Sequence, residues 1–150
     1  MATIRTASSF ERPILVDIWL RSVRASHAFL TDSDFDSLRP ATANYLRQPE
    51  LEIWVACHAL RLMGFMCLSG AVVEALFLEP DCWRKGLGTR LLTHARALRG
   101  PLSVDVNEQN ESAVRFYRAN GFSVSGRSEL DDAGRPFPLL HLRQVGDHRV

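Results

Sequence analysis

The sequence predicts a mixed α/β domain whose central, twisted and mostly antiparallel sheet has about six to seven strands and is flanked by about four helices. Short apolar runs bounded by turn residues, such as 51–57 and 62–69, indicate strands. Segments with apolar residues at helical spacing lie before and after these runs. Since 46% of the 150 residues are hydrophobic, one core can form, and we expect residues 1–150 to be a single domain.

The N-terminal third is expected to contain one edge strand and one helix before a second helical region. Residues 2–7 are typical of an edge strand. Ser8 or Ser9 is expected to cap a helix that runs to about Arg24. Its apolar face would comprise Ile14, Leu15, Ile18, Trp19 and Val23.

The second helical region is predicted to begin at a polar cap and to end before a proline. Thr31, Asp32 or Ser33 supplies the cap, and Pro49 follows Gln48. Pro40 is expected to break or kink this region, because proline lacks the N–H of an internal helical hydrogen bond.

Three strands are expected next. Residues 51–57 and 62–69 form a hairpin, although the connection 58–61 has neither Gly nor Asn-Gly. Residues 72–78 form the third strand. A further strand at 102–106 precedes a helix that begins after Asn110.

The C-terminal part predicts a final pair of strands. These are residues 122–128 and 137–145, separated by the turn-rich segment 131–136. The tail 146–150 is expected to lie outside the core.

A strand, a glycine loop and a helix follow one another between residues 72 and 98. Gly86 and Gly88 allow backbone N–H groups at a helix N-terminus to approach a phosphate closely. Arg84 and Lys85 add two cations. Two such glycines also occur in simple tight turns, so the surrounding strand and helix matter to the interpretation.

Two common nucleotide-binding loops do not fit this segment. A P-loop requires Gly-Lys followed by Ser or Thr, whereas Lys85 precedes Gly86. A dinucleotide-binding loop requires a small third residue where Leu91 stands. A pyrophosphate loop of another type remains.

A second motif lies from Asn110 to Phe122 and includes Ala113, Phe116-Tyr117 and Gly121-Phe122. Together, the two segments resemble the GNAT family of N-acetyltransferases, which use acetyl-CoA. The resemblance covers residues 72–122 in motif detail. It implies the GNAT acyl-CoA N-acyltransferase fold and an enzyme that moves an acetyl group from acetyl-CoA to a primary amine of a small molecule or peptide.

The resemblance also implies which residues hold acetyl-CoA as co-substrate. Backbone groups near the end of the strand 72–78 would bind pantetheine and polarise the thioester carbonyl. The implied cofactor-binding residues are Leu76, Phe77, Leu78, Arg84, Lys85, Gly86, Leu87, Gly88, Thr89, Asn110 and Tyr117. The family usually has Gln or Arg where Trp83 stands, so the Trp83 side chain must lie away from the pyrophosphate.

Tyr117 is the predicted general acid. Asn110 and Tyr117 are seven residues apart, which is about two helical turns, so they share a helix face. A phenol with a pKa of about 10 can protonate a leaving thiolate. The alternative is an aromatic residue packed beside Phe116.

Two carboxylates are candidates for the general base that deprotonates the amine. Asp105 alternates with Val104 and Val106, and is expected to point toward the cleft. Glu74 lies among apolar residues of the strand 72–78. Each is also a candidate for a structural carboxylate paired with an arginine.

The acceptor pocket is expected near the first two helices. His27 lies between these helices, where the family forms its acceptor site, and Trp19 and Phe29 are the other candidate substrate-binding residues. A lone histidine is more often a surface or packed residue, and the identity of the amine is left open.

Composition limits the partners. A formal net charge of +1 with both signs interspersed predicts no nucleic-acid partner. Cys57, Cys67 and Cys82 lack metal-ligand spacing, which predicts reduced core thiols, no metal and a cytoplasmic protein. No membrane segment is expected. Homodimer formation is left open.

Two other functions would use part of the same motifs. A non-catalytic acyl-CoA-binding regulatory module would keep the loop and Asn110 but would not need Tyr117. An RNA-acetylating enzyme would need more clustered basic residues than Arg84 and Lys85. Tyr117 favours catalysis.

Overall fold

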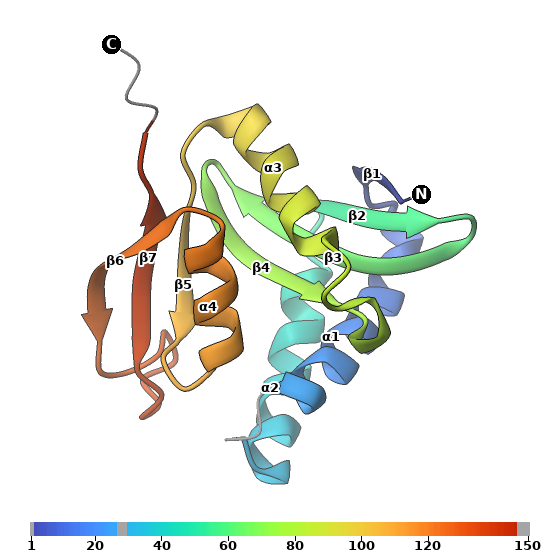
Figure 1. The fold of residues 1–150 in the computed structure, drawn as a ribbon. Coiled ribbons are helices and arrows are strands. Elements are labelled where there is room, and N and C mark those ends of the chain that lie inside the picture. Colours follow the sequence, from blue (N-terminus) through green and yellow to red (C-terminus); the bar gives the residue numbers. More distant parts are fainter. Residues whose placement is uncertain (1, 27–29, 147–150) are drawn as a thin grey trace.

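Seven strands form one sheet in the order β1-β2-β3-β4-β5-β7-β6, and every neighbouring pair is antiparallel except β4 and β5 (Figure 1). The computed structural model describes residues 2–26 and 30–146. The strands are β1 (Thr3–Thr6), β2 (Glu52–His58), β3 (Arg61–Ser69), β4 (Val72–Leu78), β5 (Ser103–Asn107), β6 (Phe122–Ser128) and β7 (Leu139–Gln144). The helices are α1 (Arg12–Ser26), α2 (Asp32–Leu46), α3 (Leu87–Arg99) and α4 (Glu111–Ala119), with short 3₁₀ turns at Ser9–Glu11 and Pro80–Cys82.

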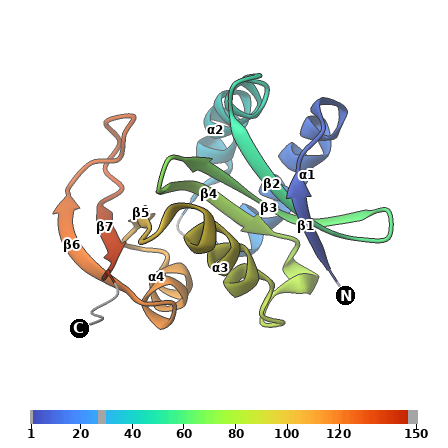
Figure 2. The same cartoon turned by 90° about the horizontal axis from the view of Figure 1, so that it is seen from above.

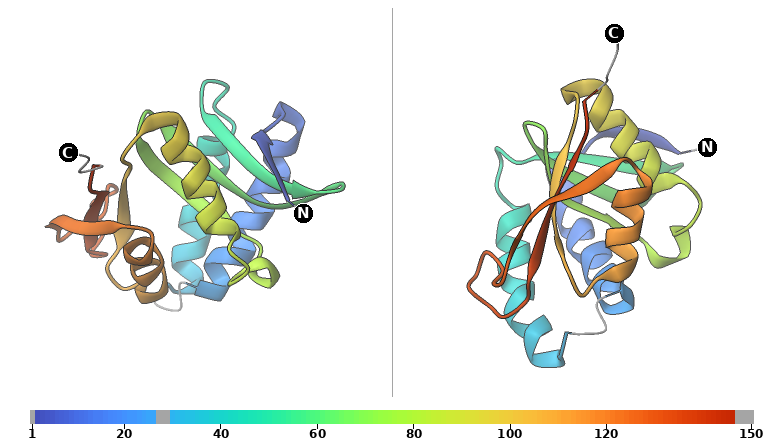
Figure 3. Two further views of the ribbon diagram at one scale, coloured as in Figure 1. Left: turned by 45° about the horizontal axis from the view of Figure 1, so that its top comes forward. Right: turned by 60° about the vertical axis from the view of Figure 1, so that its left-hand side comes forward.

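Helices cover both faces of the sheet. Figure 2 shows α1 and α2 on one face and α3 and α4 on the other. Each face has its own core. Phe65, Leu15 and Ile18 are central to the first, whereas Met66, Leu91 and Leu142 are central to the second. Figure 3 shows α3 across the N-terminal strands and α4 beside the C-terminal ones.

Polar residues cap the N-termini of the first two helical segments, which confirms the expectation from the sequence. Ser8 and Glu11 form a capping box before α1, and Thr31 and Asp34 form one before α2. The expected break at Pro40 is wrong, because α2 continues through it. Pro40 is exposed, so the carbonyl that loses its N–H partner remains accessible to water.

The hairpin between β2 and β3 is confirmed, with His58 paired to Arg61. Ala59 adopts the left-handed conformation that Gly or Asn usually supplies, with φ of 55°. The last strand begins at Leu139 instead of residue 137, because the Phe137 N–H donates within the turn to the Arg135 carbonyl.

Strands β4 and β5 separate soon after they meet. Their parallel pairing is limited to Val72 with Ser103 and Val73 with Val104. Val73 pairs with Leu68 of β3 and Ala75 with Cys67, so Glu74 is an additional, bulged residue. Beyond this point one edge of β4 faces the opening between the two strands (Figure 1).

Candidate active site

The glycine loop ends in a helix N-terminus whose N–H groups have no side-chain cap. Gly86 is the N-cap of α3 and makes no side-chain hydrogen bond. The first N–H groups of an α-helix lack partners within the helix and favour anions. Arg84 and Lys85 are exposed beside them. This end of α3 can therefore bind a pyrophosphate.

Glycine is required at the two positions of this loop for different structural reasons. Gly86 has φ of +80°, in the left-handed region, and a Cβ there would contact nothing within 4 Å. Gly88 lies inside α3, where a Cβ would be 2.8 Å from Cζ of Phe116. Gly86 therefore shapes the turn, whereas Gly88 lets α3 approach α4.

The side chain of Trp83 is hydrogen-bonded to the end of β4. Its indole Nε1–H donates to the carbonyl of Leu78 at 3.2 Å. The position at which this chain departs from the family pattern thus ties the loop to the end of β4.

The open edge of β4 presents backbone donors. The Glu79 N–H donates to the Met63 carbonyl of β3 at 2.9 Å. Because successive peptide groups in a strand point to opposite edges, the N–H groups of Leu76 and Leu78 face the opening toward β5. Fixed dipoles at this place suit a pantetheine arm and a thioester carbonyl.

Asn110 and Tyr117 lie on the inner side of α4, as the spacing predicts. Asn110 is 8% exposed, and its side-chain oxygen accepts from the Ala113 N–H at 3.2 Å. Tyr117 is 7% exposed and packs edge-on against Phe116 and Phe122. Burial raises the pKa of Tyr117 above its ordinary value, so its phenol is protonated at neutral pH.

The two candidate bases have different partners, and neither is paired with an arginine of the described residues. Tyr45 of α2 donates from its hydroxyl to Glu74 Oε2 at 2.5 Å. Burial, followed by this hydrogen bond, raises the pKa of Tyr45. Asp105 Oδ1 is 2.7 Å from Nδ1 of His141 on the adjacent strand β7.

A cavity of about 190 Å³ lies beside the separated strands. Trp19, which is proposed from the sequence for the acceptor pocket, lines it together with Phe77 of β4 and Asn107 of β5. His27 and Phe29 lie outside the described residues. Asn107 and the rest of the lining are not among the residues predicted from the sequence; the rest comprises Val23, Leu30, Leu38, Thr42, Asp131, Arg135 and Phe137.

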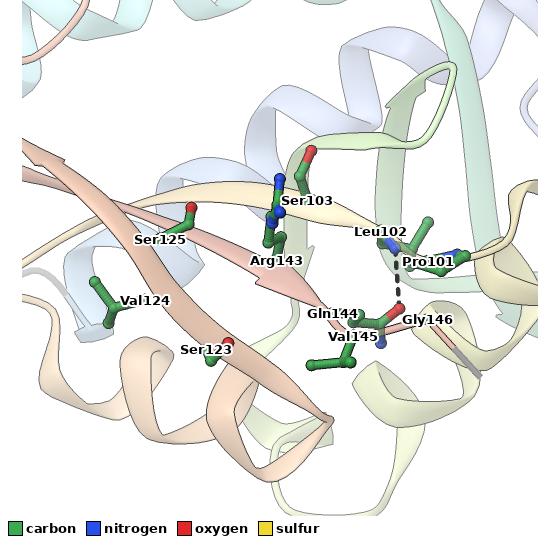
Figure 4. Close-up of a pocket in the computed structure, with 10 residues that line it drawn as sticks. All are labelled: Pro101, Leu102, Ser103, Ser123, Val124, Ser125, Arg143, Gln144, Val145 and Gly146. Carbon is green, nitrogen blue, oxygen red and sulfur yellow. Dashed lines mark hydrogen bonds between the residues drawn. The ribbon is translucent and has the colours of Figure 1, made fainter. Parts of the chain in front are cut away.

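A larger surface hollow of about 600 Å³ lies over β5, β6 and β7. Figure 4 shows Ser103, Arg143 and Ser125 along it, with the Gln144 side chain accepting from the Leu102 N–H. It is lined by none of the predicted site residues. The smaller cavity, which contacts both separated strands, is therefore the better candidate for the acceptor site.

Comparison with known proteins identifies the family. A model of the acetyltransferase (GNAT) domain matches residues 49–124, which include both the glycine loop and the segment from Asn110 to Tyr117. The chain belongs to the GNAT acetyltransferase family. It is 45% identical over 145 residues to the peptidyl-lysine N-acetyltransferase YjaB of Escherichia coli strain K12, covering 96% of this chain and 97% of that protein. The peptidyl-lysine N-acetyltransferase YiaC of the same strain is 27% identical over 135 residues, covering 89% of this chain and 91% of that protein.

Solved structures agree with this family membership. The solution structure of apo-form YjaB from Escherichia coli has a TM-score of 0.90 at 44% identity and covers 98% of this chain and 99% of that one. The PaiA N-acetyltransferase of Thermoplasma acidophilum, in complex with coenzyme A, shares the fold, with a TM-score of 0.79 at 19% identity and coverage of 96% and 98%.

This GNAT protein is an acetyl-CoA-dependent N-acetyltransferase that moves an acetyl group to an amine. The family, the fold and the activity expected from the sequence are thus confirmed. Among the described residues there is no group of three or more side chains suited to hold a metal ion. None of the helices in the described part of the chain has the length and apolar character to cross a membrane.

Proposed function

We propose that this enzyme acetylates the side-chain amine of a lysine in a protein or peptide, by direct attack in a ternary complex. The observation that carries the proposal is the cavity of about 190 Å³ between the helices α1 and α2 and the separated strands. It is smaller than the roughly 300–1,000 Å³ of sites for drug-sized ligands. Its size therefore favours a single extended side chain over a bulky amine.

The chemistry of the lining also suits lysine. Trp19, Phe77 and Phe137 provide aromatic walls for the methylene groups and for a cation. Asp131 provides a carboxylate beside them. Relatives at 45% and 43% identity are named peptidyl-lysine N-acetyltransferases, which supports the same acceptor class here.

Acetyl-CoA would lie with its pyrophosphate at the N-terminus of α3, near Arg84 and Lys85. Its pantetheine arm would follow the open edge of β4, at the N–H groups of Leu76 and Leu78. The acetyl group then lies between β4 and β5, next to the acceptor cavity. This arrangement supports attack of the amine on the thioester without a covalent enzyme intermediate.

Tyr117 is proposed as the general acid. Its burial keeps the phenol protonated, so it can donate to the thiolate as the C–S bond breaks. Glu74 and Asp105 remain the two proposed bases. Cys82 is buried, and burial raises the pKa of its thiol, which does not favour a nucleophilic role.

The proposal extends to the setting of the reaction. We place the enzyme in the cytoplasm, acting as one domain without a nucleic-acid or membrane partner. The three free, buried cysteines and the small net charge support this. A homodimer stays an open prediction, which sedimentation analysis would decide.

The acceptor is tested with two matched peptides. One has a blocked N-terminus and a single lysine, and the other has a free N-terminus and arginine in place of that lysine. Mass spectrometry after incubation with acetyl-CoA is expected to show acetylation of the first peptide alone. Acetylation of the second peptide alone would reject lysine as the acceptor.

A further inference from the structure

The side chains of Asp105, His141 and Ser128 form a hydrogen-bonded row across three strands. His141 Nδ1 lies 2.7 Å from Asp105 Oδ1, and His141 Nε2 lies 2.7 Å from Ser128 Oγ. A carboxylate can only accept, so the imidazole proton lies on Nδ1 and the Ser128 hydroxyl donates to Nε2. The row therefore has a defined direction, from Ser128 through His141 to Asp105.

The backbone makes room for this row. Gly126 pairs with His141, and a Cβ at Gly126 would lie 3.3 Å from Cδ2 of the imidazole. Val124 pairs with Leu142, so Ser125 is an additional residue in β6 at this point. The bulge and the glycine together let the imidazole lie against β6.

The row is on the acceptor side of the sheet. Asn107 lines the acceptor cavity, and Asp105 is two residues earlier on the same face of β5, about 6.6 Å away along the strand. Parallel pairing of β5 with β4 ends at Val104, so Asp105 is the first residue at the opening. No described residue donates a hydrogen bond to its second oxygen, Oδ2.

We infer that Asp105 takes the proton from the acceptor amine and that His141, held by Ser128, is the positioning residue that aims its carboxylate. This inference rests on the proposed function. An N–H bond of the lysine ammonium breaks, and its proton goes to Asp105 Oδ2. The lone pair left on nitrogen forms the bond to the acetyl carbon, the C–S bond breaks, and the CoA thiolate takes the Tyr117 proton. The nitrogen then loses its second proton to the Tyr117 phenolate as the amide forms. Asp105 then returns its proton to water.

Glu74 is less suited to this step. Tyr45 is its hydrogen-bond donor, and the two residues link α2 to the bulge in β4. We therefore assign Glu74 to shaping the opening, which leaves Asp105 as the proton acceptor.

Charged residues lie near the imidazole of His141 along the three strands. Asp105 of β5 faces it directly, and Arg143 is two residues further along β7 on the same face. On β6, Arg127 is paired with Glu108 at 2.7 Å, and Glu129 follows Ser128.

The test compares two acceptor peptides in single-turnover reactions. One contains lysine, and the other contains an aminooxy analogue that is neutral at pH 7 and needs no base. His141→Leu removes the donor to Asp105, whereas His141→Asn keeps an N–H near the position of Nδ1. Ser125→Ala is the matched control, since the Ser125 hydroxyl donates to the His141 backbone carbonyl and leaves the ring untouched.

With the lysine peptide at neutral pH, we expect His141→Leu and Asp105→Asn to react at least tenfold more slowly than the wild type. His141→Asn should recover most of this loss, and Ser125→Ala should match the wild type. With the aminooxy peptide all variants should react at similar rates. Equal losses with both acceptors, or no loss in His141→Leu, would overturn the inference. A wild type that acetylates the aminooxy peptide but no lysine peptide would instead reject the proposed acceptor.

Discussion

Gly88 of α3 faces the ring of Phe116 of α4, and the space between them holds a hydrogen atom but not a methyl group. A Cβ on Gly88 would lie 2.8 Å from Cζ and 3.1 Å from Cε1 of the Phe116 ring. This contact joins the helix that would hold the pyrophosphate to the helix that contains Asn110 and Tyr117. The two halves of the proposed donor site thus meet at this close approach.

Replacement of Gly88 by alanine is expected to weaken acetyl-CoA binding at least tenfold. The added methyl group must displace Phe116 or α3, and such overpacking destabilises by roughly 1–3 kcal/mol. Calorimetric titration with acetyl-CoA measures the affinity, and urea unfolding measures the stability. Gly88→Ala combined with Phe116→Leu should recover part of both. Unchanged affinity in a folded Gly88→Ala protein would show that the contact does not position the donor site.

The helices and strands of this fold can be predicted from short stretches of sequence, because the residues that cap helices and end strands are close neighbours in the chain. Asp34 stands three residues after Thr31, which is the spacing of a capping box, and the apolar runs of the strands end at turn residues. The break that is one of the two outcomes expected at Pro40 does not occur, because the cost of this proline depends on exposure of the helix face, which only tertiary structure determines.

The side-chain pairs of the site were not predictable in the same way. Glu74 and Asp105 could be chosen as acids at strand positions, but their partners are 29 and 36 residues away in sequence. Strand alternation tells which face a residue occupies, whereas cross-strand register decides what it touches. Nothing in the sequence around His141 therefore indicates its hydrogen bond to Asp105.

Replacement of Tyr117 by phenylalanine is expected to remove most acetyl transfer while acetyl-CoA affinity stays within about threefold. Only the hydroxyl is lost, and the ring contacts with Phe116 and Phe122 are kept. General acid catalysis is worth roughly 10²- to 10⁴-fold, so the chemical step should slow by that factor. Single-turnover kinetics measures the rate of this step. A wild-type rate in Tyr117→Phe would leave this tyrosine with a packing role only.

Replacement of Glu74 by glutamine, or of Tyr45 by phenylalanine, is expected to lower kcat/KM for the peptide by less than about tenfold, without changing the shape of its pH profile. Tyr45→Phe removes the donor of a single hydrogen bond between α2 and β4, with a net value of roughly 0.5–1.5 kcal/mol, and Glu74→Gln removes only the charge of the acceptor, because its amide oxygen still accepts. Initial rates across the pH range measure the effect. If Glu74→Gln lost activity at neutral pH and regained it at alkaline pH, Glu74 would be the base.

The two tyrosines of the chain predict a loss of stability at alkaline pH. Burial raises the pKa of both Tyr45 and Tyr117 in the folded protein. The unfolded chain releases these protons near the ordinary value of about 10, so above that pH it binds fewer protons than the folded chain. The free energy of unfolding is then unaffected below about pH 9 and falls as the pH rises through 10. Urea midpoints should show this fall, and it should be smaller in Tyr117→Phe. Phenolate absorbance near pH 10 from a folded chain would contradict the prediction.

Filling the acceptor cavity separates acceptor binding from donor binding. Thr42 lies on α2 and lines the cavity of about 190 Å³, so Thr42→Phe places an aromatic ring in the space assigned to the lysine side chain. Because the glycine loop and the open edge of β4 are untouched, we expect acetyl-CoA affinity to be unchanged while KM for the lysine peptide rises at least tenfold. Ala41→Phe is the matched control, since Ala41 is exposed on the same helix and is not part of the lining. Steady-state kinetics with the peptide and calorimetry with acetyl-CoA give the two quantities. Equal KM values for Thr42→Phe and the wild type would place the acceptor elsewhere on the enzyme.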